Sequence, residues 1–203
     1  RNILFSVDAI QSVGVIPTDV IASGIDFMAV GGHKWMMSPL GTGFLYVTEE
    51  LQARLKLVHR GYMGHVNPMD FGNFSQELSP DARRFELGAF NASGMAGAEK
   101  ATELLLECGI DSIFRHVRKL IGQFEWGLEE LPFETMYQFE EDELSSICMF
   151  SHSDHSRNEA IFKMLSESGV NISLRGGGLR LAPHYYNTPG EVDQILTLLK
   201  ENA

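Results

Sequence analysis

Three short apolar runs in the first fifty residues constrain the fold most, because turn-forming or polar residues bound each of them. The runs are ILFSVDA at 3–9, DFMAVGG at 26–32 and GFLYVT at 43–48. Apolar runs of this length are typical of buried strands. The sequence between and after them predicts short helices over 18–23 and 49–58. Such alternation of strands and helices favours a layered α/β fold with a mostly parallel sheet.

From residue 92 onward the pattern changes to helices and then alternates again. Small and apolar residues recur at helical spacing over 92–106, and 111–131 continues as an amphipathic helix. We therefore expect residues 1–91 to belong to a large α/β domain and residues 92–203 to supply linking helices and a small α+β domain. Residues 61–84 are rich in Gly, Asn, Pro and Ser, which predicts an extended loop.

The expected α+β domain contains a strand, a helix, a hairpin and a final capped helix. The segment SSICMFSH at 145–152 is strand-like, and a helix is predicted over 155–168. Three consecutive glycines at 176–178 separate NISLR from LRLAPHYY, which indicates a hairpin. In TPGEVDQ at 188–194, Thr, Pro and Glu occupy the N-cap, first and third positions of a predicted helix.

Composition argues against several classes of partner. Sixteen basic and twenty-seven acidic side chains give a formal net charge of −11, so nucleic acids and anionic membrane surfaces are poor partners. No apolar run is long enough to span a membrane. Cys108 and Cys148 are too few for a disulfide scaffold, which favours a reducing, cytoplasmic compartment. His152, Asp154 and His155 have no further ligand cluster, so we expect no metal site.

Two side chains of complementary chemistry follow neighbouring predicted strands. Asp8 lies at the carboxyl end of the first run, and Lys34 lies two residues after the second. Ligands of open α/β sheets bind outside the carboxyl ends of the strands. An acid and an amine at that edge suit pyridoxal phosphate (PLP), whose pyridine nitrogen stays protonated beside a carboxylate and whose aldehyde forms an imine with an amine. Gln11 can donate a hydrogen bond to the ring oxygen. The alternative is that Asp8 is a turn residue and Lys34 a solvated lysine.

The motifs around these residues resemble those of the class V aminotransferase family. SVDAIQSVG, DFMAVGGHKW and GTGFLYVTEE occur in that order, followed by PDARRFELGAFN at 80–91 and LRLAPHYYNTPGEVDQI at 179–195. The resemblance covers nearly the whole chain. It implies a homodimeric PLP-dependent transferase of fold type I, with a large domain of mostly parallel strands and a small α+β C-terminal domain. Because the chain opens inside a strand pattern without a methionine, we expect it to be the C-terminal half of such an enzyme.

Residue by residue, the resemblance implies roles for four side chains near the sheet edge. Lys34 forms the internal aldimine with PLP and shuttles protons during turnover. Asp8 pairs with the pyridinium nitrogen, and Gln11 contacts the ring hydroxyl. His33 matches a histidine that contacts the phosphate, although a turn histidine held by the backbone is the alternative.

An arginine in the last motif is implied to bind the substrate. Arg180 matches the arginine that holds the α-carboxylate of an amino acid, a role that suits the bidentate guanidinium group. Arg175, five residues earlier, is the rival for this role.

The sequence departs from the family pattern at three places. Gly31 stands where many members have a serine that contacts the phosphate, and Ala89 stands where many have a threonine. Between Ser151 and Arg180 there is no cysteine, whereas desulfurases of the family carry their nucleophilic cysteine on a loop before the arginine motif. Cys108 and Cys148 are expected to be structural, so ordinary cysteine desulfuration is disfavoured.

We therefore expect a PLP-dependent enzyme that acts on an amino acid, with transamination as the first expectation. A β-eliminating lyase without the loop cysteine, or an epimerase, is the alternative. A third possibility is a scaffold protein that retains the fold without catalysis.

Overall fold

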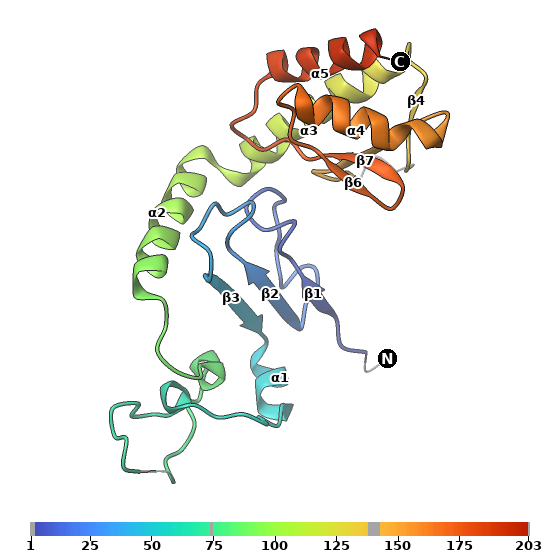
Figure 1. Cartoon of the computed structure of the whole chain (residues 1–203). Helices are drawn as coiled ribbons and strands as arrows, with labels where there is room; N and C mark the ends of the chain where they lie inside the picture. The colour runs from blue at the N-terminus through green and yellow to red at the C-terminus, as the bar shows by residue number, and fades with distance from the viewer. Residues whose placement is uncertain (1–2, 74, 138–142, 203) are drawn as a thin grey trace. The chain divides into compact units, whose positions relative to one another are not determined.

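The chain folds into two compact units, residues 1–108 and residues 109–203, and each is described by itself (Figure 1). Helix α2 (Ala92–Cys108) belongs to the first unit. The expected assignment of residues 1–91 to a large domain and 92–203 to linking helices and a small domain stays a prediction. The computed structural model describes three stretches of the chain: residues 3–73, 75–137 and 143–202.

The first unit contains a three-stranded sheet in the order β1-β2-β3. Its strands are the three predicted from the sequence: β1 (Ser6–Asp8), β2 (Phe27–Gly31) and β3 (Gly43–Val47). Strands β1 and β2 are parallel, as expected, whereas β3 returns antiparallel to β2. The reason is the connection: the chain reaches β3 through a turn, without the crossover helix that a parallel neighbour needs.

A compact apolar cluster supports this sheet. Parts of β2 and of the loops after β1 and β2 contribute to it, which ties both loops to the same core. Its fully or largely buried members are Ala9, Ile25, Met28 and Val30, with Val7, Val13, Val20, Met36 and Tyr46 packed against them.

The prediction of a helix over 18–23 is wrong, because this segment forms a single turn. Asp19 caps that turn: its Oδ1 accepts hydrogen bonds from the backbone N–H groups of Ile21 (2.9 Å) and Ala22 (3.0 Å). Gly24 then adopts a left-handed backbone with φ of 64°, which ends the turn.

The helix predicted over 49–58 exists but is shorter, since α1 spans Glu49–Arg54. The extended loop predicted over 61–84 is confirmed in the residues described there. It contains two single-turn 3-10 helices, η1 (Tyr62–Gly64) and η2 (Ala82–Phe85). Phe74, inside this predicted loop, lies outside the described residues.

The second unit is the expected α+β fold, with a four-stranded antiparallel sheet in the order β4-β5-β7-β6. The predicted hairpin is confirmed as β6 (Ser173–Arg175) and β7 (Gly178–Leu181), and the predicted strand as β5 (Cys148–His152). Strand β4 (Phe133–Thr135) was not predicted, because three residues are too few to establish an alternating pattern.

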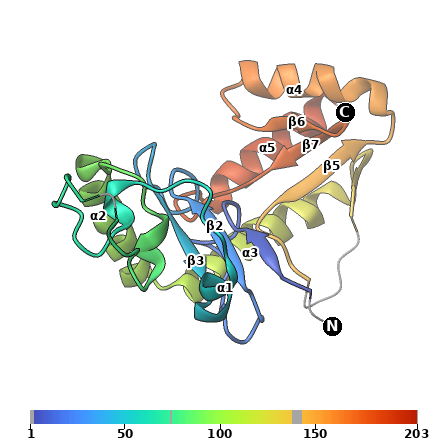
Figure 2. The same cartoon turned by 90° about the horizontal axis from the view of Figure 1, so that it is seen from below.

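Helices cover one face of this second sheet. In Figures 1 and 2, α4 and α5 lie on the same side of the strands. The elements that accompany the strands are α3 (Ile110–Leu128), η3 (His155–Arg157), α4 (Asn158–Glu167) and α5 (Pro189–Glu201).

The amphipathic pattern of α3 explains the core of the second unit. Phe124 of α3 meets Phe150 of β5 edge to face, with ring centroids 4.9 Å apart. The predicted start of α5 is also confirmed, since Thr188 Oγ1 accepts from the N–H of Glu191 and Glu191 Oε2 accepts from the N–H of Thr188. Among the described residues, no helix is both long and apolar enough to cross a membrane.

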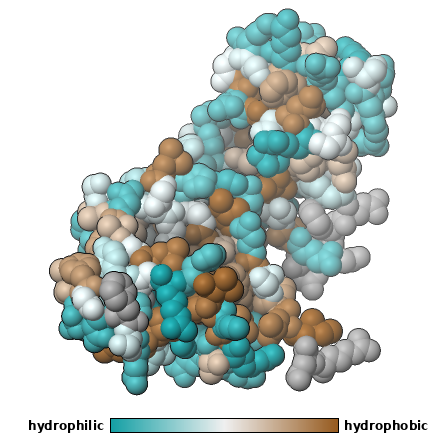
Figure 3. Space-filling view, turned by 60° about the horizontal axis from the view of Figure 1, so that its bottom comes forward, coloured by the Kyte–Doolittle hydropathy of each residue, from teal (hydrophilic) through white to brown (hydrophobic). Residues whose placement is uncertain are grey.

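Large apolar side chains are exposed on the first unit. The segment leading into β1 exposes Ile3, Leu4 and Phe5 by 74%, 48% and 49%. Figure 3 shows apolar side chains of this kind at the surface of the molecule. Contiguous apolar surface of this type is commonly covered by other polypeptide in the native protein.

Candidate functional site

Lys34 lies in a tightly hydrogen-bonded turn that follows β2. Gly32 ties the two ends of the turn together, because its N–H donates to the carbonyl of Thr42 (2.9 Å) and its carbonyl accepts from the N–H of Ser38 (2.8 Å). The carbonyl of Lys34 itself accepts from the N–H of Met37 (2.9 Å), a residue with φ of 52°. The turn is therefore a fixed platform for the lysine.

Burial alternates sharply along this turn. His33 and Lys34 are both exposed, whereas Trp35 is only 4% exposed and Met36 packs against the apolar cluster of the sheet. Trp35 and Met36 thus anchor the turn in the core while the histidine and the lysine face solvent. The anchoring role of Trp35 was not predicted from the sequence. Its signal was a large aromatic residue directly after a polar pair.

Asp8 and Gln11 lie at the same edge of the sheet as the lysine turn. Asp8 is the last residue of β1 and pairs in register with Ala29 of the parallel strand β2. Both parallel strands end at this edge, so the structure brings Asp8, Gln11, His33 and Lys34 to one end of the sheet. This is the edge at which α/β sheets bind ligands.

Asp8 also has the turn role that the sequence left open. Its Oδ1 accepts a hydrogen bond from the N–H of Ile10 (3.1 Å), which shapes the start of the loop after β1. The Asp8 residue is nevertheless exposed, so its carboxylate is accessible to a ligand while it shapes the loop.

The side chain of Ile10 occupies the space where a side chain at position 31 would lie. A Cβ added at Gly31 would lie 2.9 Å from Ile10 Cδ1 and 3.3 Å from Cε1 of His33. A serine at position 31, as many family members have, therefore requires Ile10 to shift. The other position that lacks a hydroxyl, Ala89, is exposed in the loop between η2 and α2.

Arg180 lies in the middle of β7, in the second unit. It pairs in register with Met149 of β5 and Ser173 of β6. One Nη atom donates a long hydrogen bond to Ser173 Oγ (3.4 Å), and the buried Nε has no hydrogen-bond partner among the described residues. A guanidinium group this poorly satisfied is available for an acceptor such as a carboxylate.

Arg175, the rival, is exposed at the end of β6 opposite Gly178. Arg180 and Arg175 both belong to the second unit, whereas Lys34 belongs to the first. The substrate-binding role of either arginine therefore stays a prediction.

The two cysteines occupy different environments. Cys108 is exposed at the end of α2, and Cys148 is completely buried at the start of β5. Burial raises the pKa of the Cys148 thiol to about 11, although a hydrogen bond with Tyr137 acts in the opposite direction. A thiol with this pKa is almost entirely protonated near neutral pH and is a poor nucleophile.

Thiol labelling in the folded protein tests this difference. We predict that an alkylating reagent at pH 8 modifies Cys108 readily and Cys148 at least about a hundredfold more slowly, because about one Cys148 thiol in a thousand is ionised there and the residue is buried. Peptide mapping after a timed quench measures both rates, and denaturation should make the two rates similar. Equal rates in the folded protein would show that Cys148 is accessible.

The histidines expected to lie outside any metal site form hydrogen-bonded contacts. His152 is buried, packs edge-on against Phe133 and lies 3.1 Å from Arg157 through Nε2. His155 is exposed and pairs with Glu134 (3.5 Å). In the part of the chain that the structure describes, no group of three or more His, Cys, Asp or Glu side chains is arranged to hold a metal ion.

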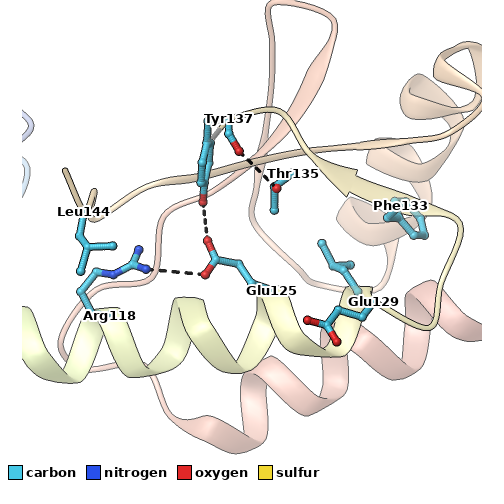
Figure 4. Close-up of a pocket in the computed structure, with 8 residues that line it drawn as sticks. Arg118, Glu125, Glu129, Phe133, Thr135, Tyr137 and Leu144 are labelled. Carbon is cyan, nitrogen blue, oxygen red and sulfur yellow. Dashed lines mark hydrogen bonds and ion pairs between the residues drawn. The ribbon is translucent and has the colours of Figure 1, made fainter. Parts of the chain in front are cut away.

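A separate pocket of about 450 Å³ lies between α3 and β4 in the second unit (Figure 4). Its polar wall is internally paired: the hydroxyl of Tyr137 donates to Glu125 Oε1 (2.7 Å), and Arg118 pairs with Glu125 Oε2 (3.6 Å). None of the residues that the sequence analysis selected lines this pocket.

The chain is similar in structure and in sequence to known proteins. A cysteine desulfurase from Thermococcus onnurineus NA1 has a TM-score of 0.84 to this chain at 24% identity, and the match covers 98% of this chain and 52% of that one. The fold is therefore that of part of a fold type I PLP-dependent enzyme. The profile described as aminotransferase class-V matches residues 1–192, and the chain belongs to the class V aminotransferase family. The expected cofactor is confirmed for this family, which uses PLP.

Two curated relatives illustrate the similarity in sequence. A probable cysteine desulfurase of Methanothermobacter thermautotrophicus is 28% identical over 98% of this chain and 53% of its own length. An uncharacterized aminotransferase, YcbU, of Bacillus subtilis is 31% identical over 95% of this chain and 50% of its own length. The chain thus spans about half the length of the curated relatives it matches.

Proposed function

We propose that this chain forms the lysine-bearing part of a PLP-dependent enzyme that acts on an amino acid. The observation that carries the proposal is that Asp8 and Lys34 both lie at the carboxyl edge of the parallel pair β1 and β2. The residues fit the cofactor: the lysine stands exposed on a fixed turn, and an accessible carboxylate lies at the same edge. When bound, PLP withdraws electrons from the α-carbon of an amino acid.

Each side chain at this edge has a distinct part in the proposal. The amine of Lys34 binds the cofactor covalently and carries protons to and from the substrate through Nζ. Asp8 keeps the pyridine nitrogen protonated, because a nearby carboxylate favours the charged form. Gln11 donates to the ring oxygen, and His33 contacts the phosphate. His33 is exposed directly before the lysine, and its accessibility supports this role.

Arg180 is proposed to bind the α-carboxylate of the substrate. Its buried and unpartnered Nε supports this role, because a carboxylate would satisfy donors that the described residues leave unused. Arg175 remains the rival because it lies on the neighbouring strand of the same hairpin.

We further propose that the protein works as a homodimer in a reducing, cytoplasmic compartment. Exposed apolar side chains such as Ile3, Leu4 and Phe5 support a need for additional polypeptide cover, which a second subunit or the rest of the protein supplies. The free and exposed thiol of Cys108 supports a reducing compartment. The net charge of −11 supports a small-molecule substrate in preference to nucleic acid or a membrane.

Transamination is our first proposal for the reaction, and β-elimination is the second. The curated relatives named as cysteine desulfurases favour cleavage of the carbon–sulfur bond of cysteine, which the second reaction also achieves. The segment between Ser151 and Arg180 opposes ordinary desulfuration, since it contains no cysteine to accept sulfur. A lyase that releases sulfide directly needs no such cysteine. Epimerisation and a scaffold role are the remaining alternatives.

Product analysis separates these reactions. The full-length protein is incubated with PLP and single amino acids, with and without an α-keto acid. Transamination, which we expect, forms a new amino acid only when the keto acid is present. β-Elimination converts cysteine and water to pyruvate, ammonia and sulfide without it, and epimerisation forms only the D-isomer. A protein that never changes the PLP absorption spectrum would contradict the enzyme proposal and favour the scaffold.

A further inference from the structure

The loop after β1 and the Lys34 turn touch through their backbones at one position. Gly14, in that loop, is buried and has φ of 101°. A Cβ at Gly14 would lie 2.8 Å from the carbonyl carbon of Trp35 and 2.9 Å from its carbonyl oxygen. These are main-chain atoms of the residue directly after Lys34, so they cannot swing aside as the end of a side chain can. Only glycine permits this approach.

The loop that carries Gly14 is itself fixed to the sheet. The N–H of Ala9 donates to the carbonyl of Ala29 in β2 (2.9 Å), and the N–H of Val13 donates to the carbonyl of Ala9 (3.0 Å). Val13 also packs against the apolar cluster. Asp8 ends the strand from which this loop starts, and Gln11 lies in the same short, bonded loop as Gly14, so we expect a displacement at Gly14 to reach both residues.

Two further observations connect this loop with the end of β2 and with the Lys34 turn that follows it. Ile10 lies against Gly31, where an added Cβ would come within 2.9 Å of its Cδ1. Val13 of the loop and Met36 of the turn pack against the same apolar cluster. The loop thus contacts the Lys34 turn through the backbone, contacts the end of β2 through Ile10, and shares the apolar cluster with the turn.

We propose that Gly14 is a positioning residue that sets the distance between the Lys34 amine and the Asp8 carboxylate. The inference rests on the proposed function, because it matters only if one cofactor is held by both groups. A cofactor of fixed size requires a fixed spacing between the amine and the carboxylate, and a misplacement of about 1 Å at a reacting group can cost about a hundredfold in rate. Glycine achieves this spacing by letting the loop rest directly on the peptide after Lys34.

The test compares Gly14→Ala with Gly24→Ala in the full-length protein. Gly24 also has a positive φ (64°), but a Cβ there has no atom within 4 Å, so this variant carries backbone strain without the contact. We expect Gly14→Ala to bind PLP at least about tenfold more weakly and to shift the pH dependence of the cofactor absorption spectrum. Gly24→Ala should match the wild type in both. Circular dichroism and urea unfolding report whether each variant folds.

Two results of this comparison would decide against the inference, and a replacement experiment covers a variant that does not fold. If folded Gly14→Ala matches Gly24→Ala in PLP affinity and in the pH profile, Gly14 does not position the site. If the wild type takes up no PLP, the proposed function fails, and the inference fails with it. If Gly14→Ala does not fold, hydrogen exchange of the wild type replaces the comparison. PLP should then protect amides of residues 12–16 together with those of 34–38, and protection confined to 34–38 would overturn the coupling.

Discussion

Replacing Lys34 with alanine is expected to reduce turnover by at least about a thousandfold while the protein stays folded. The loss follows because the variant has no amine to bind PLP or to carry protons. Stability should change by less than about 0.5 kcal/mol, because the Lys34 side chain is exposed and its turn is held by backbone hydrogen bonds. Steady-state kinetics with the substrate identified by product analysis measures the first effect, and urea unfolding measures the second.

Lys56→Ala is the matched control for Lys34→Ala, since Lys56 is another exposed lysine of the first unit. It should leave both turnover and stability unchanged. A Lys34→Ala variant that keeps wild-type turnover would remove the central assignment. A variant that is inactive because it is unfolded would show instead that the lysine supports the turn.

Replacing Arg180 with alanine is expected to raise the KM for the amino acid about 10- to 150-fold. Hydrogen bonds to charged groups contribute about 1.5–3 kcal/mol each, and losing one of them accounts for this range. The cofactor should stay attached, because in the proposal Lys34 and Asp8 hold it without Arg180. Kinetics over a range of substrate concentrations and the PLP absorption spectrum measure the two effects separately.

Arg175→Ala provides the control from the same hairpin. Arg175 is exposed at the end of β6, so its removal should change KM by less than about twofold. If the two variants exchange these results, Arg175 binds the carboxylate. If neither variant changes KM, a residue elsewhere in the protein binds it.

Much of the fold could be predicted from the sequence because the spacing of apolar residues indicates which side chains of a strand or helix are buried. The apolar runs that became β1, β2 and β3 and the cap that starts α5 are local signals, and local signals determined those elements. The helix expected over 18–23 failed because the Asp19 side chain competes for the backbone N–H groups of a single turn. Strand β4 is stabilised by pairing with β5, a long-range contact that its three residues do not reveal.

The chemical groups of the candidate site could be predicted from the sequence, but the backbone contacts that hold them in position could not. Asp8 and Lys34 were predicted as site residues because Asp8 ends one strand and Lys34 follows the next, and the parallel pairing of those strands brings both to one edge. The contact of Gly14 with the backbone of Trp35 was not foreseen. A glycine in a loop has many explanations in sequence, and only the folded chain shows which backbone approaches it.

For Arg180, too, the residue could be predicted from the sequence but its surroundings could not. Its position in the last family motif could be recognised in the sequence. Its orphaned Nε depends on the neighbours that β5 and β6 supply, Met149 and Ser173, and these are contacts between distant segments. The structure therefore added a physical reason to prefer Arg180 over Arg175.

The most direct test of the central assignment is to locate the cofactor on the chain. The full-length protein is incubated with PLP, reduced with borohydride and digested, and its peptides are analysed by mass spectrometry. We predict that the reduced pyridoxyl phosphate group is found on Lys34 and that prior incubation with an amino acid substrate lowers the yield. A group found on another lysine, or no labelled peptide at all, would contradict the assignment of Lys34 as the cofactor-binding residue.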